Sequence, residues 1–87
     1  MSKDEIFSFL KESLVEMFEI DESKITPESL IYEDLEVDSI DAIDLMLHIK
    51  KKTGYQMEAS DFKSVKTLWD IVEVVFNQMQ TKQDENR

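Results

Sequence analysis

The sequence predicts an all-α fold: a small four-helix bundle of three main helices plus one short helix, with a long loop between the first and second helices. Three observations support this prediction. The chain has 87 residues, the size of one domain. Gly54 and Pro27 are the single glycine and proline, too few for the tight turns of a β-sandwich or barrel. Several stretches carry apolar residues at spacings of three and four, which is the helical period.

The first helix is predicted over residues 3–19. Ser2 followed by Glu5 has the pattern of a capping box, in which each side chain binds the backbone amide of the other residue. The apolar positions behind it are Ile6, Phe7, Leu10, Leu14, Met17 and Phe18. From residue 20 to 38 this periodicity is absent, so we expect a long loop. Thr26 and Pro27 could begin one short helical turn within it.

The second main helix is predicted from Ser39 to Thr53. Ser39 stands where a serine is favoured as the helix cap, and the first amides of a helix form an anion site. Gly54 follows the last turn as a left-handed terminator. If Ser39 is the cap, Ser39→Ala should cost about 0.5 to 2 kcal/mol of stability.

The remaining helices are predicted after Gly54. One helical turn is expected from Ala59 to Phe62, and Thr67 should cap the last main helix. The apolar stripe of that last helix is Leu68, Ile71, Val72, Val75, Phe76 and Met79. We therefore expect residues 1–80 to form a single domain and residues 81–87, which contain no apolar side chain, to form a disordered C-terminal tail.

Charge and composition limit the classes of function. The chain has 20 acidic and 10 basic residues and a net charge of −10, so nucleic acid and anionic lipid are poor partners and a basic protein surface is a good one. No apolar stretch is long enough for membrane insertion, and the first residues lack the pattern of a signal peptide. With no cysteine, there is no thiol nucleophile or thiolate metal site. We expect a cytoplasmic protein.

The second helix carries two apolar rows. One row fits a core-facing stripe: Ala42, Leu45, Met46 and Ile49. The other row, Ile40, Ile43 and Leu47, is rotated away from the first and lies beside Asp41 and Asp44. Either this second row is an exposed docking surface, or the long loop folds over it.

The string LEVDSIDAIDLMLHIKKKTG, followed by VKTLWDIVEVV, resembles the acyl carrier protein family over essentially the whole chain. The resemblance implies that Ser39 receives 4'-phosphopantetheine from coenzyme A, attached by a phosphopantetheinyl transferase. Asp38 would support the transferase and its magnesium. Such carriers hold acyl intermediates as thioesters on the arm and have no catalytic residues and no resident metal of their own.

The resemblance also implies a set of partner contacts. Asp41, Ile43, Asp44 and Leu47 match positions through which the family meets its enzymes, and Ile40 extends the same row. The expected partners are ketosynthases, acyltransferases or acyl ligases, met by a monomeric carrier. The lysines at 50–52 replace the acidic residues usual in the family, which indicates a dedicated lipid or polyketide-type pathway rather than the common fatty-acid biosynthesis system.

A serine hydrolase would need a base, but the single histidine, His48, lies nine residues from Ser39, half a turn out of phase and about 13.5 Å along one helix. The alternative that stays open is a small acidic protein-interaction module in which the apolar row binds a partner and Ser39 is only a helix cap.

Overall fold

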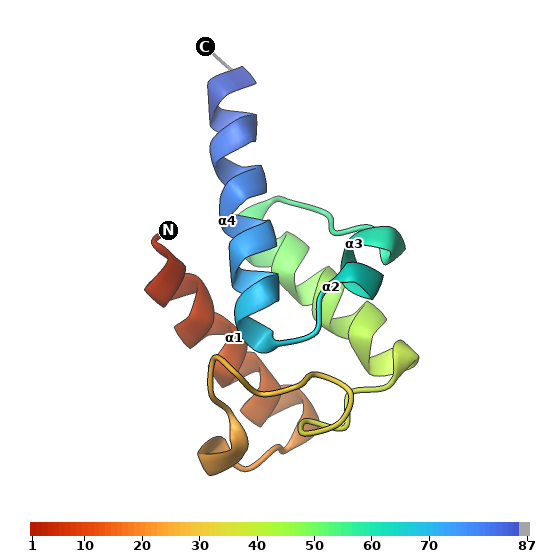
Figure 1. The fold of residues 1–87 in the computed structure, drawn as a ribbon. Coiled ribbons are helices and arrows are strands. Elements are labelled where there is room, and N and C mark those ends of the chain that lie inside the picture. Colours follow the sequence, from red (N-terminus) through yellow and green to blue (C-terminus); the bar gives the residue numbers. More distant parts are fainter. Residues whose placement is uncertain (86–87) are drawn as a thin grey trace.

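The computed structural model describes residues 1–85, and residues 86 and 87 lie outside the described part. Within it the chain forms α1 (Lys3–Phe18), a 3-10 turn η1 (Glu22–Lys24), α2 (Ser39–Thr53), α3 (Ala59–Ser64) and α4 (Leu68–Glu85), as Figure 1 shows. The described residues contain no β-strand beyond an isolated bridge between Leu30 and Thr67. The all-α prediction, with three main helices and one short helix, is confirmed.

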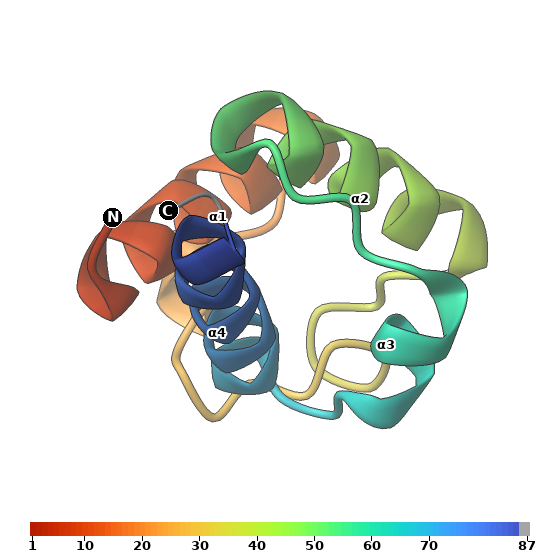
Figure 2. The same ribbon diagram turned by 90° about the horizontal axis from the view of Figure 1, so that it is seen from above.

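The helices pack around a single core. α1 lies beside both α4 and α2, and Figure 2 shows α3 on the far side of the bundle from α1. One cluster of buried side chains joins all four helices and the loop: Ile6, Leu10, Leu14, Ile25, Ile31, Leu35, Val37, Ala42, Leu45, Met46, Ile49, Met57, Phe62, Val65, Leu68, Ile71, Val72 and Val75. Trp69 packs against this cluster and is partly buried.

Local signals in the sequence explain where the helices begin. Ser2 and Glu5 form the predicted capping box: the Glu5 amide donates to Ser2 Oγ at 3.2 Å, and the Ser2 amide donates to Glu5 Oε1 at 2.8 Å. At the start of α4 the Asp70 amide donates to Thr67 Oγ1 at 3.2 Å, while Asp70 Oδ2 accepts from the Thr67 amide at 3.0 Å. These bonds satisfy amides that have no partner inside their helix.

The long loop is tied to the start of α4, below which it runs in Figure 1. The amides of Leu68 and Trp69 donate to the carbonyls of Ser29 and Pro27, both at 3.0 Å, and the Ile31 amide donates to the Lys66 carbonyl at 3.0 Å. Because these bonds join residues more than thirty positions apart, the loop has a defined path.

Two predicted boundaries were wrong. The short turn in the loop is η1, capped by the Asp21 carboxylate, and lies before Thr26 and Pro27. Pro27 instead lies in a hydrogen-bonded turn in which the Ser29 amide donates to the Thr26 carbonyl at 3.1 Å. The last helix continues to Glu85, although we expected it to fray after Gln80. Residues 81–85 contain neither Gly nor Pro, so nothing in their backbone stops the helix. The rest of the expected tail, residues 86 and 87, lies outside the described residues.

Candidate functional site

The N-terminus of α2 is capped by Asp38 and not by Ser39. Asp38 has an extended backbone, with φ −89° and ψ −175°, and its Oδ1 accepts from the Asp41 amide at 2.8 Å. The expectation that Ser39 is the cap is therefore wrong. Aspartate and serine are both good capping residues, but a carboxylate also interacts favourably with the positive end of the helix. The Asp38–Asp41 bond has the usual geometry of a cap, in which the side chain accepts from the amide three residues later.

Ser39 is the first residue of α2, and its side chain is exposed. Among the described residues no hydrogen bond engages its hydroxyl group. The first backbone amides of a helix have no partner within it, so an anion attached to Ser39 would lie at the positive end of the helix dipole. Ser39 thus presents a free hydroxyl group at a position suited to a phosphate group.

The last residues of the loop hold this helix start in place. Leu35 and Val37 are buried on either side of the exposed Glu36, and the Val37 amide donates to the Ile31 carbonyl at 3.1 Å. Glu36 itself has φ 54°, in the left-handed region that side chains rarely adopt. Sequence reasoning missed this bend; the alternation of two buried residues around one acidic residue was the available signal.

The outer row of α2 is exposed. The side chains of Ile40, Ile43 and Leu47 are 70%, 53% and 48% accessible, whereas the inner row of Ala42, Leu45, Met46 and Ile49 is buried. The long loop therefore does not cover the outer row, because it is bonded to the start of α4 instead. Asp44 is exposed and Asp41 half-buried beside the row. Exposed apolar side chains gathered on one helix are typical of a docking surface.

Acidic side chains also surround a depression of about 330 Å³ next to the start of α2. It is bounded by the end of α1, the loop and Asp41, and its charged lining residues are Glu19, Asp21, Lys24, Asp34, Glu36 and Asp41. In the described part of the chain no three acidic or histidine side chains are grouped closely enough to hold a metal ion. Because five of these six charged residues are acidic, the depression contributes a negative electrostatic field beside Ser39, which favours a basic partner surface.

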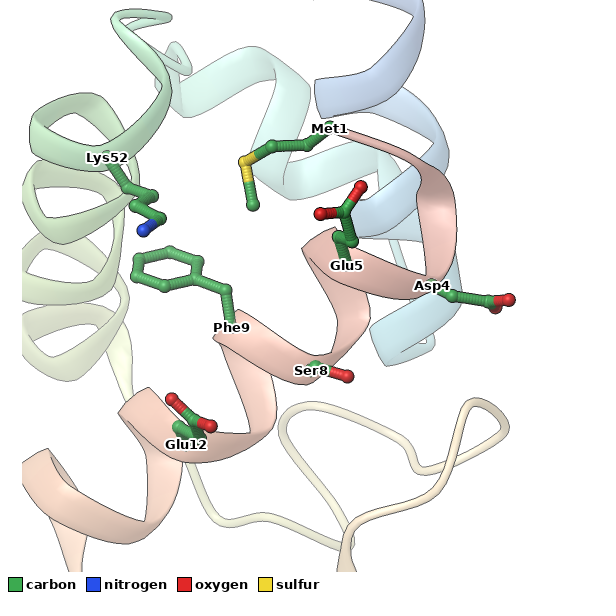
Figure 3. A pocket seen from close by; sticks show the side chains of 7 residues that line it. All are labelled: Met1, Asp4, Glu5, Ser8, Phe9, Glu12 and Lys52. Atoms are coloured by element: carbon green, nitrogen blue, oxygen red, sulfur yellow. The ribbon is translucent and has the colours of Figure 1, made fainter.

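The opposite end of α2 packs against α1. The His48 ring stacks on the Phe9 ring, with centroids 5.1 Å apart, and the Lys52 ammonium lies 5.9 Å from the Phe9 centroid. Figure 3 shows Lys52 directed over Phe9 at the edge of an open depression of about 360 Å³. His48 is thus half-buried against α1 and lies away from Ser39 on the helix.

Comparison with known proteins gives a consistent result. The family model described as the phosphopantetheine attachment site matches residues 8–75. Acyl carrier protein 2 of Ralstonia nicotianae is 37% identical over 75 residues, which cover 86% of this chain and 93% of that protein. The acyl carrier proteins of Coprothermobacter proteolyticus and Thermotoga maritima are 32% identical over 82 residues and 34% identical over 74 residues. Those matches cover 94% and 85% of this chain, and 100% and 91% of the two relatives.

Proposed function

The chain belongs to the acyl carrier protein family, and from this premise we propose that Ser39 carries the family's covalently attached 4'-phosphopantetheine. The thiol of that arm supplies the thioester on which a carrier holds acyl groups. On this proposal the protein delivers acyl intermediates to the enzymes of a dedicated lipid or polyketide-type pathway and catalyses no step itself.

The observation that carries the proposal is that Asp38 caps α2 while Ser39 is left exposed. Since the Asp38 carboxylate binds the Asp41 amide, the cap does not need Ser39, and its exposed hydroxyl group has no partner among the described residues. Because Asp38 is the cap, the alternative of an interaction module in which Ser39 is only a cap is weakened. The site also fits a phosphodiester, because the hydroxyl group faces solvent at a helix N-terminus.

The chain's own residues would supply positioning rather than chemistry. Asp38 fixes the first turn of α2 and so the direction of Ser39, and it is our proposed support for the transferase and its magnesium. Ile40, Asp41, Ile43, Asp44 and Leu47 are the proposed contacts for the phosphopantetheinyl transferase and for ketosynthases, acyltransferases or acyl ligases. The net charge of −10 disfavours self-association, which supports action as a monomer, and we propose a cytoplasmic location.

Intact-mass spectrometry tests the attachment. The chain is incubated with coenzyme A and a broad-specificity phosphopantetheinyl transferase, and we expect a gain of one phosphopantetheinyl group. Ser39→Ala should show no gain. Ser60→Ala is the matched control, because Ser60 is also exposed in the first turn of a helix, and this variant should be modified like the parent chain. Modification of Ser39→Ala, or none of the parent chain, would contradict the proposal.

A further inference from the structure

The exposed face of α2 changes the sign of its charge along the helix. Asp38, Asp41 and Asp44 accompany the first half of the outer row, and three consecutive lysines, 50–52, end the helix. All three lysines could complement the negative end of the helix dipole.

Helical geometry places two of the lysines on that face. Lys50 and Lys51 follow Leu47 by three and four positions, the spacings at which side chains of a helix lie on one side. Lys52 follows Leu47 by five positions, a rotation of about 140°. Its ammonium group lies 5.9 Å from the Phe9 ring of α1, and Figure 3 shows it directed there.

Lys50 and Lys51 are exposed and make no ion pair with any side chain that the structure describes. Among the residues whose side chains the structure describes, 1–58 and 60–79, the ion pairs join Lys3 to Glu73 and Lys11 to Glu22. Lys52, by contrast, faces α1: the Ser2 hydrogen bonds mainly lower the pKa of Glu5, and the N-terminal ammonium and then Lys52 add smaller effects in the same direction. The charges of Lys50 and Lys51 are therefore free to meet another molecule.

The two charged ends are far enough apart to be recognised separately. Asp41 and Lys51 are ten residues apart, which is about 15 Å along the helix. That separation exceeds the Debye length of about 8 Å at physiological salt, so neither end neutralises the other for an approaching protein. A surface that is basic along its whole length would attract the first half of α2 and repel the second.

We propose that this face docks a pathway enzyme with a bipolar surface: basic opposite Asp44 and, at the edge of the face, Asp41; apolar opposite Ile43 and Leu47; and acidic opposite Lys50 and Lys51. The inference deepens the proposed carrier function by naming the charge pattern of the partner. The unpaired lysines then exclude enzymes made for a uniformly acidic carrier, since like charges placed opposite each other disfavour binding.

The test uses single charge reversals at neighbouring lysines. The probe is a fatty-acid ketosynthase chosen because its carrier-docking surface is basic throughout, and the substrate is the acylated, arm-bearing chain. Lys51→Glu should raise kcat/KM by about 3- to 10-fold at physiological salt. Lys52→Glu makes the same change of charge one residue away, but on the side of α2 that faces α1. It should therefore change kcat/KM by less than about 2-fold. High salt should remove the difference.

A reciprocal enzyme variant completes the test. Replacing the ketosynthase cations nearest the end of α2 by Glu should favour the parent chain over Lys51→Glu. An unchanged kcat/KM for Lys51→Glu, or an equal rise for Lys52→Glu, would overturn the inference.

The dissociation constant of each unloaded variant for the same ketosynthase, measured by surface plasmon resonance, is expected to follow the same order. This binding measurement decides the inference whether or not Ser39 is loaded. Absence of loading would contradict only the proposed function.

Discussion

Each of two faces of α2 carries a row of apolar residues, but one row is buried and the other is exposed. Leu45 on the inner face is 1% accessible, whereas Leu47, two residues later on the outer face, is 48% accessible. The inner row packs into the core shared with α1 and α4. The outer row faces solvent between acidic residues and lysines.

Hydrophobicity alone therefore does not determine the role of an apolar residue in α2. Burial of an inner residue stabilises the fold because its apolar surface leaves water when the chain folds. An outer residue keeps that surface in water until a partner covers it. The same helix can therefore divide its residues between stability and docking.

The largest effect is expected from truncating the two leucines. Leu45→Ala should lower the free energy of unfolding by about 2 to 5 kcal/mol, because it leaves a cavity in the core. Leu47→Ala should change it by no more than about 0.5 kcal/mol but should lower kcat/KM with a ketosynthase. Urea unfolding measures the first quantity. Equal losses of stability in the two variants would show that the outer row packs within the monomer.

A smaller effect should distinguish Asp38 from Ser39 at the start of α2. Asp38→Ala should lower the free energy of unfolding by about 0.5 to 2 kcal/mol through loss of the cap, while Ser39→Ala should change it by less than about 0.5 kcal/mol. Asp38→Asn keeps an acceptor oxygen and is the control, with stability near that of the parent chain. If Ser39→Ala proved the more damaging change, the assignment of the cap would have to be reversed.

The smallest effect concerns Tyr55, just beyond the end of α2. Its hydroxyl group donates to Asp61 Oδ2 at 2.8 Å, and burial together with the Asp61 carboxylate raises the pKa of Tyr55 from 10.0 to about 12. Folding thus favours the neutral phenol. Its contribution to stability is complete below pH 10 and is lost as the pH rises toward 12.

Tyr55→Phe should therefore lower the free energy of unfolding by about 0.5 to 1.5 kcal/mol at neutral pH. Between pH 10 and 12 the free energy of unfolding should also fall less in the variant than in the parent chain, because the variant has no phenol to ionise at this position. Urea unfolding of the two proteins at several pH values provides the measurement. Parallel pH profiles would contradict the raised pKa.

Most of the helices could be predicted because their signals are local. The capping box at Ser2 and Glu5 acts over three residues, and Gly54 ends α2 through its own φ of 80°. The inner row of α2 follows from helical periodicity, which needs no knowledge of the partner helix. The serine at the start of α2 could be recognised for the same reason, since the motif around it is continuous in the chain.

Three features depend on tertiary structure: the cap of α2, the exposure of its outer row and the environment of Lys52. Asp38 and Ser39 are both capping types, and only the path of the loop, set by buried Leu35 and Val37, places Asp38 at the cap. The loop left Ile40, Ile43 and Leu47 uncovered because its amides and carbonyls bond to the start of α4. Helical spacing turns Lys52 away from Lys50 and Lys51, but only the packing of α1 against α2 places Phe9 beneath it. Each of these outcomes depends on contacts between distant segments, which local spacing does not encode.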